Sequence, residues 1–221
     1  MTCDKNRMRL YAVTDQTWTG KQTLCEQVEA ALKGGVTCVQ LREKELSEKE
    51  FIEEAIAIRK ICQFYQVPLI INDNVNVALH SGADGIHIGQ TDMKIMDVRR
   101  ILGENKIIGV SAHSVEEAIE AVRNGADYLG VGAVFTTSTK LDATALSYET
   151  LRDICHSVTI PVVAIGGIHK ENILKLSGSG IDGVALVSAI FSARDIEREC
   201  KELSRTIHNM ITNEYGRSLH K

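Results

Sequence analysis

This 221-residue sequence has little proline, no long apolar segment and no excess of positive charge. Only 2 residues are proline, beside 17 glycines, and 44% are hydrophobic, which is typical of a globular protein without low-complexity linkers. No run approaches the ~18 consecutive apolar residues of a membrane-spanning helix. The N-terminal segment MTCDKNRMRL also lacks the apolar core of a secretory signal. We therefore expect no membrane partner.

The charge balance excludes a second class of partner. The formal net charge is −4, whereas nucleic acids and anionic membranes are held by dense Lys/Arg surfaces. We expect no nucleic-acid partner, and any anionic ligand must be met by a local group of cations. The six cysteines are scattered, with no C-x-x-C pair, so neither a zinc site nor a disulfide framework is indicated. A reduced, cytoplasmic setting fits this pattern, and the sequence leaves open whether the chain forms a homo-oligomer.

Eight short β-rich runs alternate with amphipathic segments along the chain. The runs cover residues 10–13, 38–41, 69–71, 85–88, 107–110, 128–131, 162–165 and 183–187. Helical segments 47–65 and 114–125 each begin with a serine followed three residues later by a glutamate, which is the pattern of a capping box. This alternation predicts a (β/α)8 TIM barrel, for which ~250 residues are typical. We expect a single domain over residues 1–221, with its core at about 8–212.

Internal repeats support the barrel over an open doubly wound sheet. SGADGIHIG, NGADYLGVG and GSGIDGVALV each end a helix on glycine and enter a strand through a turn that contains aspartate. An open sheet with a nucleotide site usually carries a glycine-rich phosphate-binding motif. GVGAVF at residues 130–135 lacks the third glycine of G-x-G-x-x-G, and no G-x-x-x-x-G-K-[ST] occurs. Nucleotide binding is therefore disfavoured.

Polar residues follow the predicted strands at the end where TIM barrels carry their chemistry. In chain order they are Gln40, Arg42 and Lys44, then Asn72 and Asp73, Gln90 and Asp92, Ser111 and His113, Thr137, Thr139 and Lys140, Gly166 and Gly167, and Ser188. Side chains alternate along a strand, so Gln40, Arg42 and Lys44 share one face of an extended chain. These polar groups are expected on one rim.

Two parts of this rim indicate specific ligands. Gly166 and Gly167 follow the seventh strand, where many barrels bind phosphate through backbone N–H groups. Ser188, after the eighth strand, adds a hydroxyl. The alternative for the two glycines is an ordinary turn without a ligand. Arg42, Lys44 and Lys140 indicate a polyanion, which Asp73 and Asp92 would repel. A Mg²⁺ ion between the two carboxylates removes that conflict. The alternative is that each aspartate caps a helix.

Two histidines lie in or after the predicted strands and have different expected roles. His87 lies between Ile86 and Ile88 and is expected to be a hydrogen-bonded core residue rather than an acid or base. His113 follows Ser111, and a catalytic role and a helix-start role are both open.

The motifs resemble the thiamine-phosphate synthase family over nearly the whole chain, from LYAVTD at residue 10 to VALVSAI at residue 184. The resemblance rests on Q-x-R-x-K from Gln40, N-D from Asn72, G-Q-x-D from Gly89, S-x-H from Ser111, T-x-T-K from Thr137, I-G-G-I from Ile165 and V-S from Val187. Seven motifs in this order are highly specific.

The resemblance implies a transferase that joins 4-amino-2-methyl-5-hydroxymethylpyrimidine diphosphate to hydroxyethylthiazole phosphate by a dissociative mechanism. It implies that Gln40, Arg42, Lys44 and Asn72 bind the pyrimidine diphosphate, and that Ser111 and Lys140 assist the departing diphosphate. Asp73 and Asp92 would bind Mg²⁺. The thiazole phosphate would be received by Thr137, Thr139, Gly167, Val187 and Ser188.

The sequence departs from the family pattern after the sixth strand. Ala133 and Thr136 stand where the family commonly has proline, which predicts a less restrained loop. Three rivals remain: a thiazole tautomerase that relies on a histidine near His113, a sugar-phosphate isomerase, and a metabolite-binding regulator without catalysis. The aspartates and Lys140 argue against the first, and the excess of basic rim residues argues against the second.

Overall fold

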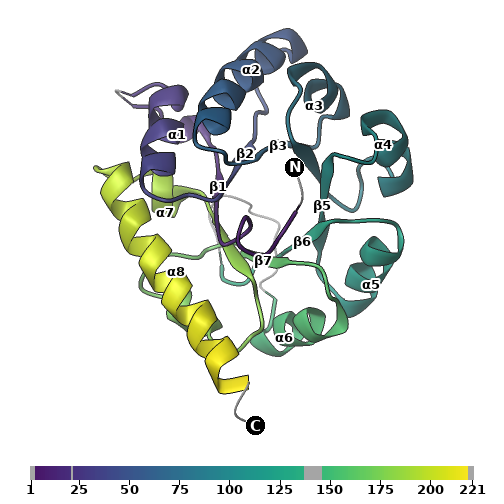
Figure 1. Ribbon diagram of the computed structural model, residues 1–221, viewed down its shortest axis with the longest axis vertical. Helices are drawn as coiled ribbons and strands as arrows, with labels where there is room; N and C mark the ends of the chain where they lie inside the picture. Colours follow the sequence, from purple (N-terminus) through teal and green to yellow (C-terminus); the bar gives the residue numbers. More distant parts are fainter. Residues whose placement is uncertain (1–2, 21, 137–145, 219–221) are drawn as a thin grey trace.

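Eight parallel strands close into a barrel with helices around it (Figure 1). The computed structural model describes residues 3–20, 22–136 and 146–218, with side chains up to residue 212. The strands are β1 (Leu10–Val13), β2 (Cys38–Leu41), β3 (Leu69–Asn72), β4 (Gly85–Ile88), β5 (Ile107–Ala112), β6 (Tyr128–Val131), β7 (Val162–Ile165) and β8 (Gly183–Leu186). Each strand pairs with the next in chain order, and β8 pairs with β1. The predicted (β/α)8 barrel is confirmed.

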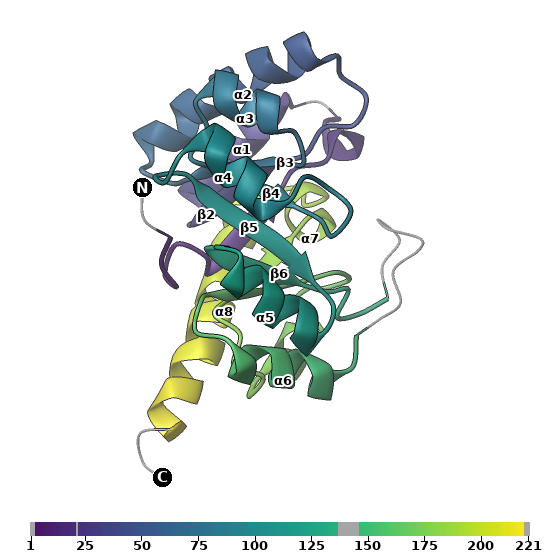
Figure 2. The same cartoon turned by 90° about the vertical axis from the view of Figure 1, so that its right-hand side faces the viewer.

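The outer layer is made mostly of α-helices. They are α1 (Leu24–Lys33), α2 (Glu48–Phe64), α3 (Val75–Ser81), α4 (Ile95–Leu102), α5 (Val115–Arg123), α6 (Tyr148–Ser157), α7 (Ser188–Phe191) and α8 (Ile196–Ser218). Two 3-10 helices, η1 (Gln16–Trp18) and η2 (Ile173–Leu176), lie in the connections after β1 and β7. The long α8 contacts η2, β1 and β8, and its C-terminal end points away from the barrel (Figures 1 and 2).

Of the two predicted capping boxes, the one at the start of α2 is complete and the one at the start of α5 is only half formed. Ser47 and Glu50 form the full reciprocal capping box at the start of α2. At α5, Ser114 accepts from the Glu117 N–H as predicted, but the Glu117 carboxylate accepts from the backbone N–H of His113 instead. That second box is therefore incomplete.

The repeated aspartate turns have a common structural role. Asp84, Asp127 and Asp182 each accept, through a side-chain oxygen, a backbone N–H from the first or second residue of the preceding strand, at 2.8 to 3.0 Å. Each also donates its own N–H to a carbonyl of that strand, at 2.8 to 2.9 Å. The glycine two residues before each aspartate has a positive φ, which turns the chain into the strand that follows the aspartate. These turns fix the bottom of the barrel, opposite the rim that carries the polar residues.

Two apolar layers hold the barrel together. The larger lies between strands and helices and includes Val39 and Leu41. The smaller fills the barrel interior, where Met8, Tyr11 and Tyr128 are almost completely buried. The interior is therefore a packed core whose tyrosines carry polar atoms inward.

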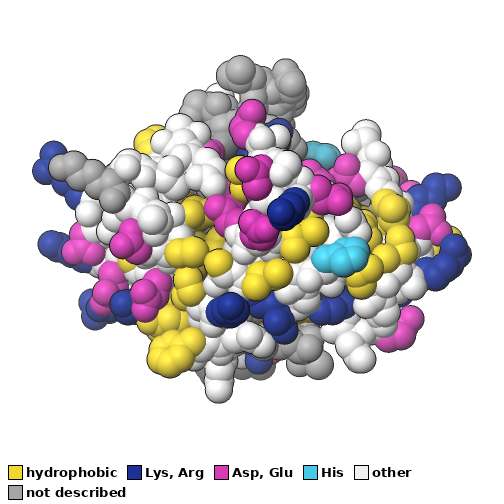
Figure 3. Space-filling view, turned by 90° about the horizontal axis from the view of Figure 1, so that it is seen from above, with side chains coloured by type: hydrophobic (Ala, Val, Ile, Leu, Met, Phe, Trp, Pro, Cys, Tyr) yellow, Lys and Arg dark blue, Asp and Glu magenta, His cyan; other side chains and the backbone are white. Residues whose placement is uncertain are grey.

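The outer face over α2, α3 and α4 carries hydrophobic side chains among charged ones (Figure 3 shows the face seen from above Figure 1). Phe64 is 80% exposed and Met96 is 61% exposed. Single exposed apolar side chains of this kind are ordinary for a protein surface. Within the described residues, every helix is too short or too polar to cross a lipid bilayer.

Candidate active site

A cavity of about 620 Å³ opens at the C-terminal ends of the strands. Seven of the predicted site residues line it together: Gln40, Arg42, Asn72, Ser111, Gly167, Val187 and Ser188. They come from β2, β3 and β5 and from the connections after β2, β7 and β8, which end at the same rim because the sheet is parallel. Thr137, Thr139 and Lys140 lie outside the described residues.

Strand β2 presents polar groups to the cavity by simple alternation. Val39 and Leu41 are fully buried against the helices, while Gln40 faces the cavity. Arg42 lies one residue past the strand, where its backbone N–H donates to the Thr14 hydroxyl at 3.0 Å. Lys44 does not share that face, because the extended strand ends at Leu41 and Lys44 is exposed on the following loop.

Asp73 and Asp92 lie beside each other, next to Asn72 and Arg42, but neither lines the cavity, and Asp92 lines a separate pocket of about 360 Å³. Burial and the neighbouring Asp92 carboxylate raise the pKa of Asp73 to about 6, against the opposing effects of Asn72 and Arg42. The Asn72 amide donates to Asp73 Oδ2 at 2.6 Å, and the Gly89 N–H donates to Asp92 Oδ2 at 2.6 Å. Asp73 also has a φ of 61°, an unusual backbone conformation for a non-glycine residue.

Neither aspartate caps a helix. The cap of α3 is Asn74, whose side chain accepts from the Val77 N–H at 2.9 Å. The residue before α4 is Lys94, which makes no side-chain cap bond. The helix-cap alternative for the two carboxylates is therefore wrong, and another reason is needed for placing like charges side by side.

The floor of the cavity contains a hydrogen-bonded chain that the sequence did not predict. Gln40 Nε2 donates to the Tyr11 hydroxyl at 2.9 Å, and the Tyr11 and Tyr128 hydroxyls are 2.7 Å apart. His87 Nδ1 lies 3.0 Å from the Tyr128 hydroxyl, and its Nε2 lies 3.0 Å from Ser111 Oγ. His87 is thus a hydrogen-bonded histidine as expected, but it faces the cavity. The signal for the tyrosines is weak: a phenol in a buried strand usually has a polar partner, but the sequence does not say which.

Burial keeps both phenols protonated. Desolvation is the largest cause that raises the pKa of Tyr11 and of Tyr128 well above the ordinary value of a tyrosine. Each hydroxyl therefore has one proton to donate at neutral pH.

The connection after β7 forms the opposite side of the cavity. Gly166 and Gly167 have φ values of 101° and 63°, which favour glycine. A Cβ on Gly167 would lie 2.4 Å from the Thr136 carbonyl oxygen, so no side chain fits there. The buried Asn172 side chain donates to the Gly167 carbonyl at 2.8 Å and accepts from the His169 N–H at 2.9 Å. The loop is thereby held in the shape that exposes its backbone.

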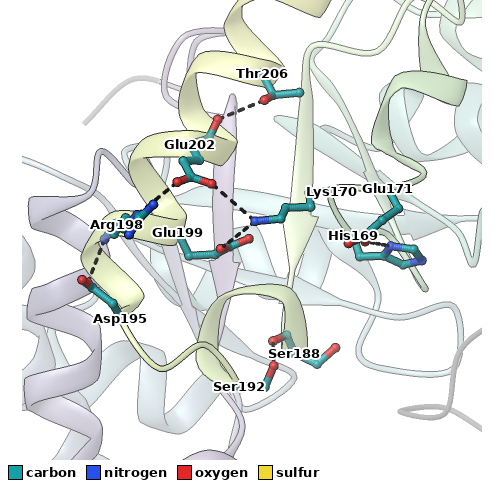
Figure 4. A network of polar contacts seen from close by, with 10 residues as sticks. All are labelled: His169, Lys170, Glu171, Ser188, Ser192, Asp195, Arg198, Glu199, Glu202 and Thr206. Atoms are coloured by element: carbon teal, nitrogen blue, oxygen red, sulfur yellow. Dashed lines mark hydrogen bonds and ion pairs between the residues drawn. The ribbon is translucent and has the colours of Figure 1, made fainter.

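Lys170 ties the same loop to α8 (Figure 4). Its ammonium lies 3.2 Å from Glu199 Oε2 and 3.3 Å from Glu202 Oε2. Glu202 is also paired with Arg198 at 3.2 Å. Figure 4 shows Ser188, at the start of α7, below this network and not joined to it. Because α7 also packs against α8, both connections predicted to bind phosphate contact that helix.

A second carboxyl pair lies beside Arg42, outside the cavity. Burial and the nearby Glu54 raise the pKa of Glu43 to about 7. Glu54 accepts from Gln16 at 3.1 Å, while Glu43 Oε1 and Glu54 Oε2 are buried with no hydrogen-bond partner. A proton shared by the two carboxyl groups would satisfy both oxygens.

Comparison with known proteins places the chain in a family. The family model described as thiamine monophosphate synthase matches residues 10–190. The chain belongs to this family. Thiamine-phosphate synthase of Clostridium acetobutylicum is 53% identical over 193 residues, which is 87% of this chain and 92% of the relative. That of Ruminiclostridium cellulolyticum is 54% identical over 194 residues, 88% of this chain and 92% of the relative.

A solved structure agrees with the family. Thiamine phosphate pyrophosphorylase from Pyrococcus furiosus has a TM-score of 0.87 and 40% identity, and covers 94% of this chain and 98% of its own. The predictions of the barrel, of the thiamine-phosphate synthase family and of its transferase activity are confirmed.

Proposed function

We propose that the cavity joins 4-amino-2-methyl-5-hydroxymethylpyrimidine diphosphate to hydroxyethylthiazole phosphate, with Mg²⁺ held between Asp73 and Asp92. The observation that carries this proposal is the pair of carboxyl groups placed against each other beside Asn72 and Arg42, which line a cavity together with five other family residues. Family membership supports the reaction, and the charges of this chain support where each substrate binds.

The two aspartates fit a magnesium ion. Their oxygens are hard donors, and Mg²⁺ is commonly held by one or two carboxylates together with substrate phosphates and waters. The described residues contain no group of three or more His, Cys, Asp or Glu that could hold a metal alone, so the substrate would complete this site. When bound, Mg²⁺ neutralises charge on the diphosphate. The bound cation would then offset the electrostatic repulsion between the Asp73 and Asp92 carboxylates.

The residues around the metal site match a pyrimidine diphosphate. Arg42 lies beside Asp73 and provides a fixed cation for the diphosphate, and Lys44 can reach from the exposed loop. Gln40 and Asn72 offer amide donors and acceptors to the pyrimidine ring, and Ser111 offers a hydroxyl to the leaving group. Lys140, from the sequence motif, is assigned to the same diphosphate.

The glycine connection after β7 suits the thiazole phosphate. Gly167, Val187 and Ser188 line the other side of the cavity, so the phosphate would meet backbone N–H groups and the Ser188 hydroxyl. Thr137 and Thr139 are assigned to the same substrate from their motif. The two substrates would then face each other across one cavity.

The reaction requires no base from the protein. The bond between the pyrimidine methylene carbon and the diphosphate oxygen breaks, and both electrons leave with the diphosphate. The thiazole nitrogen then forms a bond to that carbon with its lone pair. Catalysis comes from stabilising the leaving charge and from positioning, which supplies as much as ~7–11 kcal/mol in well-oriented systems.

Turnover with both substrates tests the proposal. We expect thiamine phosphate and diphosphate to form with Mg²⁺ and to stop when a chelator is added. Asp92→Ala should lower kcat/KM by about 100-fold, a typical loss for a group that stabilises transition-state charge, without changing the circular dichroism spectrum. Chelator-resistant turnover, or full activity of the variant, would remove the metal from the proposal.

Two wider predictions remain. The scattered cysteines support a cytoplasmic setting. A homo-oligomer stays a prediction as well, which sedimentation of the purified chain would test.

A further inference from the structure

The chain of hydrogen bonds under the cavity joins two sites that serve different parts of one substrate. Gln40 and Ser111 both line the cavity, from β2 and β5. Between them run three buried or half-buried groups, Tyr11, Tyr128 and His87, with every step at 2.7 to 3.0 Å. A change at one end can therefore reach the other without any movement of the backbone.

The orientation of Gln40 is compatible with one continuous direction for the bonds in this chain. Its Nε2 donates to the Tyr11 hydroxyl, which can then donate its single O–H to Tyr128; the buried Cys38 sulfur is the other side-chain partner of Tyr11. The Tyr128 proton then goes to His87 Nδ1. In a neutral imidazole the proton consequently lies on Nε2, where it donates to Ser111 Oγ.

This direction leaves the Ser111 hydroxyl proton available to the cavity. Ser111 already accepts from His87, and its own O–H can donate to an anion such as a departing diphosphate. If the Gln40 amide turned over, its oxygen would accept from Tyr11 and every bond would reverse. Ser111 would then donate to His87 and present only lone pairs to the diphosphate.

The barrel is built to hold the two rings in the middle of the chain. A Cβ on Gly109 of β5 would lie 2.1 Å from the Tyr128 ring, and a Cβ on Gly130 of β6 would lie 2.8 Å from the His87 ring. Both strands therefore need glycine at these positions. Tyr11 and Tyr128 are each 1% exposed, so solvent does not compete for their hydroxyls.

We propose that Gln40, Tyr11, Tyr128, His87 and Ser111 form a specificity relay that couples recognition of the pyrimidine amino group to activation of the leaving diphosphate. The inference rests on the proposed function, because it uses the assignment of Gln40 to the pyrimidine ring. An amino group donates, so it requires the Gln40 oxygen and keeps Nε2 on Tyr11. A ring with an oxo group in its place accepts, so it would require Nε2 and reverse the relay. Tyr11, Tyr128 and His87 are positioning residues in this scheme.

The protonation pattern of His87 tests the relay without any substrate. Long-range ¹H–¹⁵N spectra of the labelled protein at pH 8 should show the Nε2–H tautomer, assigned by its loss in His87→Asn. Gln40→Glu replaces the donor by an acceptor, so the Nδ1–H tautomer should appear. Should that variant not fold, Tyr128→Phe should show both tautomers. Tyr65→Phe, which loses a half-buried bond to Glu29 at 3.2 Å on the outer layer, is the control and should match the wild type. One unchanged tautomer in all these proteins would overturn the relay.

A kinetic comparison tests its consequence. For the wild type, kcat with the 4-oxo analogue of the pyrimidine diphosphate should fall about 100-fold below kcat with the amino substrate. Tyr128→Phe should reduce that ratio to less than about tenfold, because Ser111 is no longer controlled by Gln40. Equal losses for both substrates, with the ratio preserved, would refute the coupling. Absence of turnover in the wild type would refute the proposed function, while the His87 spectra would still decide the relay.

Discussion

Asp73 has a backbone conformation and an ionisation that both favour a ligand. Its φ of 61° and its position beside Asp92 are each unfavourable for a free protein. Its pKa of about 6 lies above the ordinary value of 3.8. Ionising this carboxyl therefore costs stability as the pH rises from about 4 to 6, and the cost persists at higher pH.

Asp73→Asn should make the metal-free protein more stable and inactive. The pKa difference would correspond to about 3 kcal/mol, and solvent access to the pair reduces the expected gain to about 1 kcal/mol. Urea unfolding with a chelator present should show this gain at pH 8, and the gain should vanish by about pH 3, below the ordinary pKa of 3.8, where Asp73 is largely protonated in both states. Asn also tolerates a positive φ, so no strain is added.

The control is an exposed aspartate on the outer layer. Asp97, in the first turn of α4, pairs with Arg100 at 3.2 Å. Asp97→Asn should leave both stability and turnover within about 0.5 kcal/mol of the wild type, as surface changes usually do. A destabilised Asp73→Asn at pH 8 would contradict the repulsion between the two carboxylates.

Single residues were predictable where strand alternation or a motif decided them. Gln40 and Arg42 reach the cavity as expected. Tyr11 and Tyr128 were missed because their contact joins hydroxyls 117 residues apart in the chain. The strand pattern shows only that each phenol is buried. Side-chain alternation predicts Lys44 on the same face as Gln40, but this prediction is wrong because the strand ends three residues before Lys44.

The connection after β7 depends on one amide. Asn172 bonds to both ends of the segment from Gly167 to His169, and its side chain is buried. Lys170 adds an exposed ion-pair network to α8, which is worth less because solvent screens it. Asn172 is therefore the main support of the glycine backbone.

Asn172→Ala should weaken binding of the thiazole phosphate selectively. Losing a buried amide costs about 1–2 kcal/mol, so its KM should rise roughly 5- to 30-fold, with the KM of the pyrimidine diphosphate little changed. Asn76→Ala, which removes an exposed bond to Glu48 at 2.6 Å, is the matched control in steady-state kinetics. An equal rise in both KM values would separate Asn172 from the thiazole side.

The bounds of the strands and helices could be predicted well, because the strand patterns, turns and caps that determine them are local in the sequence. Five of the eight strands have the predicted bounds, and β3, β5 and β8 differ by one or two residues at their C-terminal ends. The repeated aspartate turns help to fix the starts of β3, β5 and β7, since each aspartate accepts an N–H from the first or second residue of one of these strands. The capping box at α5 was only half correct, because Glu117 had a competing donor in the backbone of His113.

The closed barrel turns these separate segments into one site. Residues at or after the C-terminal ends of β2, β3, β5, β7 and β8 reach the same cavity only because every strand is parallel and β8 pairs with β1. Periodicity and motifs predicted this closure. The hydrogen-bonded chain beneath the cavity could not be predicted from the sequence, because it depends on how rings from β1, β4 and β6 meet inside the barrel.

The central claim is that Asp73 and Asp92 bind diphosphate through a shared Mg²⁺ ion. Calorimetry of inorganic diphosphate binding, with and without Mg²⁺, tests it most directly in the wild type and in Asp92→Asn. Mg²⁺ should tighten binding at least about tenfold in the wild type and have little effect in the variant. The same Mg²⁺ effect in both proteins would contradict the claim.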